Sequence, residues 1–280
     1  MSIKLIITAD DFGLCEEVNQ GIEECIKAEN VTSTNVMVNM PNWRSAFFLK
    51  NEYQNISLGI HFNLSQGKPV EEPSKIPSLV DENGNFLNQR KFRKNLLLGK
   101  IKKQDIRKEL TAQCQEYIST LGLPNYWNSH QNTHLWPISF DVFLSVAQEF
   151  EIEKMRSHKR FYLVSGSDHN PPFIYNLKGI GIDYWVHKAK KKGMLMPDGV
   201  IDVFGFKNGK SAFNEYIKKI NSQNKILELV IHPSTKINNP VFQNLSESRI
   251  KEYEFFRNRN ALGVIKEKNI DLVNFNLKNE

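Results

Sequence analysis

The 280-residue sequence has few cysteines and no long hydrophobic run. Its three cysteines, Cys15, Cys25 and Cys114, are an odd number without a Cys-x-x-Cys pair, which argues against a disulfide framework and a thiolate zinc site. No apolar stretch approaches the roughly 20 residues of a membrane helix, and the N-terminus shows no signal-peptide pattern. We therefore expect a cytoplasmic protein that does not enter a membrane.

The excess of positive charge is small. The net charge of +6 comes from 37 basic and 31 acidic residues, and much of the excess lies in residues 90–108 and 188–192. Both clusters lack the aromatic interleaving and the motifs of nucleic-acid-binding modules. We interpret them as solvated helix faces and loops, and nucleic acid is not an expected partner.

The sequence does contain alternating strand-like and helix-like segments, which is typical of βα units around a parallel sheet. Helix-like spacing covers residues 18–26, 106–121 and 139–150. The strand candidates are residues 3–8, 35–39, 57–63, 126–129, 154–156, 227–231 and 271–275, with an eighth near Val203. This pattern predicts one α/β domain over residues 1–280, a (β/α) barrel of about seven parallel strands. Long loop excursions are expected at about 65–99 and 160–207, around the mouth of the barrel.

Rare polar residues fall at the ends of the strand candidates. Asp11 ends the first strand, His61 ends another, His130 follows a third and His232 ends a late one. All strand C-termini of a parallel barrel lie on one face, where such enzymes build their sites. One Asp and two His around an open coordination position form a common catalytic metal site. A lone His is more often a hydrogen-bonded core residue, and at least 50 positions separate these candidates, so spacing alone does not show that they meet.

Two consecutive carboxylates, Asp10 and Asp11, end the first strand candidate. Adjacent side chains of a regular strand point to opposite faces. Either one Asp belongs to the surface, or the chain turns there and aims both at one place. Gly13 favours the turn, because glycine adopts dihedral angles that other residues resist.

Five segments in this order, TADDFG, GIHFNLSQGKP, SHQNTHLWP, KMR and VIHP, resemble the YdjC-like carbohydrate deacetylases. The namesakes of that family remove acetyl groups from chitooligosaccharides. The resemblance spans nearly the whole chain and implies a distorted TIM-like barrel, one divalent metal ion (Mg²⁺ or Zn²⁺) and an N-acetylated sugar as substrate. Metal identity, substrate length and assembly, as a monomer or a homodimer, stay open.

Carried over to this sequence, the resemblance implies that the metal ligands are Asp11, His61 and His130. It implies that Asp10 is the base that activates water. His232 would act as general acid or steady the tetrahedral intermediate.

Two further residues match the family, and two positions depart from its usual pattern. Arg156 would hold Asp10 ionised, and His134 would orient a ligand or contact substrate. The family usually reads Asp-Ser-His-x-His-x-His where this chain has Asn128 and Asn132 in place of a carboxylate and an imidazole. If either was the partner of a ligand, the change weakens metal affinity or activity by about 10- to 100-fold.

The leading hypothesis is a metal-dependent hydrolase of a linear amide C–N bond, which deacetylates an N-acetylated sugar. One alternative is a carbohydrate-binding protein of the same fold that has lost turnover through Asn128 and Asn132. Another is a metallohydrolase of a non-sugar amide or ester. The presence of both Asp10 and His232 argues against a pure binding protein, which needs neither an acid nor a base.

Overall fold

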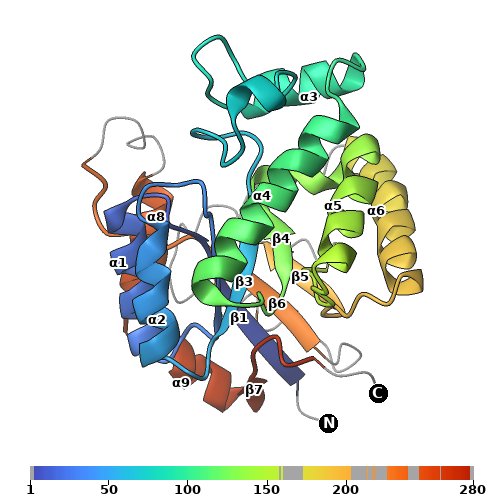
Figure 1. Ribbon diagram of the computed structural model, residues 1–280. Coiled ribbons are helices and arrows are strands. Elements are labelled where there is room, and N and C mark those ends of the chain that lie inside the picture. Colours follow the sequence, from blue (N-terminus) through green and yellow to red (C-terminus); the bar gives the residue numbers. More distant parts are fainter. Residues whose placement is uncertain are drawn as a thin grey trace.

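The computed structural model describes residues 3–157, 159, 173–202, 213, 217, 226–238, 246–258 and 260–277. At its centre, seven strands form one sheet in which every pairing is parallel (Figure 1). They are β1 (Ile3–Phe12), β2 (Ser33–Val36), β3 (Ser57–Phe62), β4 (Trp127–Ser129), β5 (Gly199–Asp202), β6 (Ile226–Ile231) and β7 (Ile270–Leu272). Their order is β4-β3-β2-β1-β6-β5, and β7 pairs with the start of β1. The predicted parallel α/β fold is confirmed.

The segment 153–157 links the two edges of this sheet. On one side, the backbone N–H of Trp127 in β4 donates to the carbonyl of Lys154 at 3.0 Å. On the other side, the N–H of Met155 donates to the carbonyl of Leu195, just before β5, at 2.9 Å. The sheet therefore curls into a distorted, incomplete barrel, as the sequence predicted.

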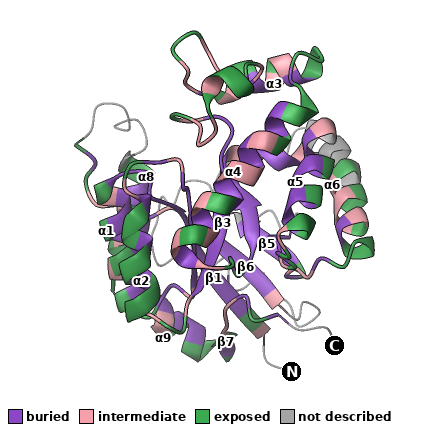
Figure 2. Cartoon of the chain, in the orientation of Figure 1, coloured by how far each residue is buried: buried purple, intermediate pink, exposed green. Residues whose placement is uncertain are grey.

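Helices surround the sheet. They are α1 (Glu16–Lys27), α2 (Ala46–Glu52), α3 (Gln89–Leu97), α4 (Lys103–Leu121), α5 (Pro137–Glu149), α6 (Phe173–Lys191), α8 (Ser246–Phe256) and α9 (Asn260–Glu267). In Figure 1, α1, α2 and α8 gather on one side, α5 and α6 on the other, and α3 projects above them. Figure 2 shows buried strands and helices whose outer faces are exposed. Within the described chain, no helix combines the length and hydropathy needed to cross a bilayer.

The structure corrects several expected boundaries. The strand expected at 35–39 begins two residues earlier, as β2, and the one expected at 271–275 is the short β7. The excursion at 65–99 contains a 3₁₀ turn (Pro73–Lys75) and α3.

The second expected excursion, residues 160–207, is not a loop throughout, since α6 and β5 lie within it. Residues 160–172 and 203–207 lie outside the described residues. The strand expected near Val203 corresponds to β5, which ends at Asp202. Two glycines in α6, Gly179 and Gly181, lower the helix propensity of the segment and made it resemble a loop.

β1 is buried on both faces, as expected for an inner strand of a parallel sheet. Leu5 and Ile7 pack in the main core with the helices, whereas Ile6 lies in a separate cluster with Tyr126 and Phe275. The rings of Tyr126 and Phe275 stack with centroids 3.7 Å apart. The hydroxyl of Tyr126 lies 3.5 Å from Nδ2 of Asn35, so this apolar cluster borders the polar residues around Asp10.

The carboxyl end of β1 is irregular. Its register against β2 shifts between Ala9 and Phe12, and Asp11 has a φ of 74°. Positive φ is uncommon for any residue except glycine, and Gly13 follows with a φ of 103°. The predicted break in regular strand geometry occurs at Asp11, but it is an irregularity within β1, which continues to Phe12, and not the end of the strand.

We expect Gly13→Ala to lower the free energy of unfolding by about 2 to 4 kcal/mol, from unfavourable dihedral angles and overpacking together. The added Cβ would lie 2.8 Å from the Cβ of Trp43. Urea unfolding measures the effect. Gly99→Ala is the matched control, because Gly99 has a φ of 67° but nothing within 4 Å of an added Cβ, so strain alone should cost about 1 kcal/mol. Equal losses in both variants would contradict the packing argument.

Candidate metal and catalytic site

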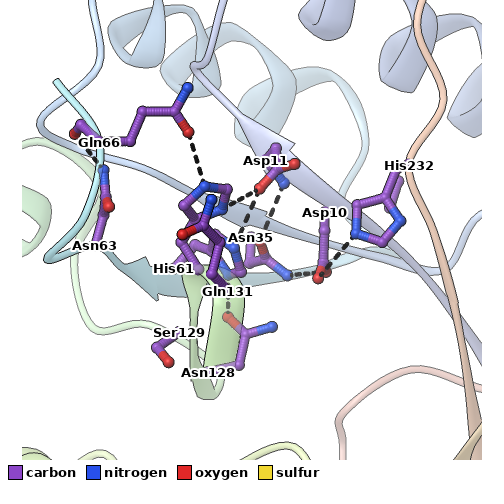
Figure 3. Close-up of polar contacts among 12 residues, drawn as sticks. Asp10, Asp11, Asn35, His61, Asn63, Gln66, Asn128, Ser129, Gln131 and His232 are labelled. Carbon is purple, nitrogen blue, oxygen red and sulfur yellow. Dashed lines mark hydrogen bonds and ion pairs between the residues drawn. The ribbon is translucent and has the colours of Figure 1, made fainter. Parts of the chain in front are cut away.

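Three side chains, from β1, β3 and the residue directly after β4, meet at the carboxyl edge of the sheet. Among the described residues, Asp11, His61 and His130 form a cluster whose ligand atoms all lie within 4.8 Å of one another. The Oδ1 atom of Asp11 is 3.2 Å from Nε2 of His61 and 2.9 Å from Nδ1 of His130 (Figure 3). One carboxylate and two imidazoles are donors that catalytic zinc and related ions use, so these residues fit a divalent cation.

The second oxygen of Asp11 has its own partner. Arg249 of α8, which is buried, donates from a guanidinium nitrogen to Oδ2. Burial alone would raise the pKa of Asp11, but His130 and Arg249 hold it well below its usual range. Asp11 is therefore ionised at neutral pH, and Arg249 leaves Oδ1 as the oxygen that faces both histidines. No motif of the sequence had pointed to Arg249.

Gln66 fixes the orientation of His130. Its Oε1 lies 2.8 Å from Nε2 of His130, on the side of the ring away from Asp11. With the oxygen so placed, Nε2 carries the proton and Nδ1 directs its lone pair into the cluster. The backbone carbonyl of Gln66 accepts hydrogen bonds from Asn39 and Asn63, which hold this segment against the barrel.

Asp10 lies beside the cluster but binds a different set of partners. Arg156 donates two hydrogen bonds to it, each 2.7 Å long, and Asn35 donates a third at 2.5 Å. Burial would raise the pKa of Asp10, but the Arg156 guanidinium lowers it below the usual range of an aspartate. Asp10 is therefore an ionised, oriented carboxylate that can accept a proton.

Arg156 is enclosed by the barrel. Only 6% of it is exposed, so it is not a surface charge. It also donates to Oε1 of Glu228 in β6, from Nε at 3.0 Å and from a terminal nitrogen at 2.9 Å. Burial would lower the pKa of Arg156, but the two carboxylates raise it. Burial also raises the pKa of Glu228, which sequence analysis had not selected.

His232 follows β6 at the same edge. Its Nε2 lies 3.9 Å from Oδ2 of Asp10, beyond hydrogen-bond distance, and its side chain is 33% exposed. Its backbone N–H donates to the carboxylate of Glu252 in α8, which fixes the chain at this point. A partly exposed imidazole next to Asp10 can exchange protons with a bound molecule.

His134 lies apart from the cluster. It is fully buried, and its Nδ1 is hydrogen-bonded to the hydroxyl of Ser129. Its ring packs against Trp127 and Phe143, with centroid distances of 5.6 and 5.9 Å. This position supports the loop that carries His130 and leaves no surface for a substrate.

The sequence matches known proteins over most of its length. A family model described as YdjC-like protein matches residues 4–267. The chain belongs to this family. The resemblance inferred from the five motifs is thus confirmed.

Two relatives and one solved structure illustrate the match. A carbohydrate deacetylase of Clostridium beijerinckii is 29% identical over 278 residues, which cover 98% of this chain and 99% of that protein. A carbohydrate deacetylase of Danio rerio is 34% identical over 155 residues, covering 55% of this chain and 49% of that protein, so this match spans about half of the relative. An Enterococcus faecalis V583 structure, provisionally named a cellobiose-phosphate cleavage protein, superposes with a TM-score of 0.79 at 24% identity and covers 98% of both chains. This similarity supports only the assignment of the fold.

We expect Gln66→Ala to weaken zinc binding by about 10-fold, because His130 loses the acceptor that fixes its tautomer. Calorimetric titration of metal-depleted protein with zinc chloride measures the change. Gln89→Ala is the matched control, since Gln89 donates to the backbone carbonyl of Gln131 at 3.3 Å and contacts no histidine of the cluster. Equal affinities for wild type and Gln66→Ala would contradict this role.

Proposed function

We propose that this protein is a divalent-metal-dependent hydrolase that removes acetyl groups from N-acetylated sugars. The observation that carries the proposal is the convergence of Asp11, His61 and His130 beside a separate, ionised Asp10. The names of the family's relatives, carbohydrate deacetylases, supply the substrate class.

The chemistry of amide hydrolysis explains why this set is suitable. The carbonyl of an acetamide is a weak electrophile, and its amine is a poor leaving group, so the reaction needs a Lewis acid, a base and an acid. A cation held by Asp11, His61 and His130 would polarise the carbonyl and acidify water. Asp10, held unprotonated by Arg156, accepts a proton from the attacking water. His232 donates a proton to the departing amine.

The pairing of Asp10 with Arg156 and the exposure of His232 favour an enzyme over a pure binding protein. Asp10 is buried as an oriented charge, and such burial is costly unless it serves pairing or chemistry. Two imidazoles and one carboxylate suit zinc or a similar transition ion better than magnesium, which prefers oxygen ligands.

Mass spectrometry of acetylated chitooligosaccharides incubated with the protein tests the proposal. We expect mass losses of one acetyl group that require a divalent metal and disappear after chelation. A parallel panel of simple amides and esters separates sugar substrates from others. Metal-dependent cleavage of the panel without cleavage of any sugar would replace the proposed substrate class.

We expect Asp10→Asn and Asp11→Asn to fail in different ways. Asp10→Asn should retain about one zinc per chain and lose turnover by at least about 10²-fold, because the base is gone while the metal ligands remain. Asp11→Asn should lose the metal itself. Metal content of the purified variants, measured beside their rates and melting temperatures, distinguishes the roles. A metal-free Asp10→Asn would reverse them.

We expect His232→Ala to keep its metal and to slow deacetylation by about 10²- to 10⁴-fold, the usual contribution of one general acid. The comparison uses saturating substrate and the same metal content as wild type. His187→Ala of α6 is the control for loss of a histidine. Normal turnover of His232→Ala would show that another group supplies the proton.

A further inference from the structure

Asn128 lies between the metal cluster and the base. It is 1% exposed and comes from β4, and its side chain lies next to His61 (Figure 3). On its other side are Arg156 and Asn35. Its two terminal atoms can exchange places by a half-turn of the amide. The two orientations make different hydrogen bonds, because one terminal atom only accepts and the other only donates.

In the first orientation, the oxygen of Asn128 faces Nδ1 of His61 at 2.5 Å. His61 then carries its proton on Nδ1, and Nε2 directs a lone pair toward Asp11, as a metal ligand must. The amide nitrogen of Asn128, however, faces the donors of Arg156 and Asn35. The N–H groups of Arg156 and Asn35 then point at the N–H groups of Asn128, so these buried donors have no acceptor there.

In the second orientation, the oxygen of Asn128 accepts from Arg156 at 2.9 and 3.0 Å and from Asn35 at 3.0 Å. The amide nitrogen then donates to Nδ1 of His61 at 2.5 Å. His61 must now carry its proton on Nε2, where it can donate to Oδ1 of Asp11, 3.2 Å away. All these groups are satisfied, but Nε2 has no lone pair left for a metal.

We propose that Asn128 is a positioning residue whose amide switches between these orientations, and that metal binding requires the turn to the first one. Without metal, the second orientation is favoured because it satisfies Arg156 and Asn35. Metal binding is therefore weakened by the energy of turning the amide, and it is coupled to the hydrogen bonds of Arg156, the partner of Asp10. The proposal rests on the metal site of the proposed function.

A carboxylate at this position removes the conflict, because both of its oxygens accept. In Asn128→Asp, one oxygen of the new carboxylate would accept from Nδ1 of His61 while the other accepts from Arg156 and Asn35. We expect this variant to bind zinc about 10- to 100-fold more tightly than wild type, measured calorimetrically on metal-depleted protein.

Asn125→Asp is the matched control for the added charge. Asn125 is exposed and lies two residues before β4, where its Oδ1 accepts from the backbone of Leu58. Because it contacts no residue of the metal cluster, its substitution should leave zinc affinity unchanged.

The position of the proton on His61 gives a second readout that needs neither metal nor activity. In ¹⁵N NMR spectra of metal-free protein, we expect Nδ1 of His61 to be unprotonated in wild type and protonated in Asn128→Asp. His61→Gln identifies the signals. Added zinc should move the proton of wild-type His61 to Nδ1.

The two readouts separate the coupling from the proposed function. Zinc binding of equal strength in wild type and Asn128→Asp, with Nδ1 protonated in both, would overturn the switch and leave the metal site standing. Failure of both proteins to bind zinc would overturn the metal site and the switch together. Tighter binding by Asn128→Asp with the expected change of tautomer supports the switch, whatever substrate the enzyme cleaves.

Discussion

The arrangement of the site depends on one buried guanidinium. Arg156 lies inside the barrel, where an unpaired charge would be prohibitively unstable, so carboxylates must meet it there. Asp10 of β1 and Glu228 of β6 do so. The Arg156 guanidinium therefore connects the segment beside β4 with two central strands. The same pairing leaves Asp10 with a fixed position and a negative charge. Stability of the barrel interior and the fixed negative charge of Asp10 thus have one physical origin.

A second arginine explains how neighbouring aspartates acquire different roles. The positive φ of Asp11 brings its carboxylate to the edge of the sheet where Asp10 already lies, and two adjacent negative charges would repel. Each has its own arginine, Arg156 for Asp10 and Arg249 for Asp11. Arg249 occupies one oxygen of Asp11 and leaves the other toward the histidines. The doublet therefore consists of two separately paired carboxylates, one beside the cluster of Asp11, His61 and His130 and one within it.

The sequence predicted the parallel fold, the break in strand geometry at Asp11 and the common edge where His61 and His130 meet, since these follow from hydrophobic periodicity and strand ends. It did not predict the partners that orient them. Arg249 lies among the other charged residues of α8, whose sequence shows no distinct apolar face, so nothing local shows that it faces inward. Glu228 did carry a signal, because a charge inside the apolar run of a buried strand requires a buried partner. Pairing over long sequence separations is set by the way the sheet curls, which local patterns do not encode.

The support of the site extends beyond the barrel to the first excursion. Gln66, which orients His130, precedes a stretch whose backbone N–H groups at Val70 and Glu71 donate to the buried carboxylate of Glu109 in α4. Burial raises the pKa of Glu109 to about 7, against the lowering effect of these hydrogen bonds. A helix outside the sheet thus anchors the segment that sets the tautomer of His130, while Asn128 inside the sheet sets that of His61. The two imidazoles are therefore oriented by different parts of the chain. Of the two orienting amides, only that of Asn128 has, among the described residues, others, Arg156 and Asn35, that compete with the imidazole for its oxygen.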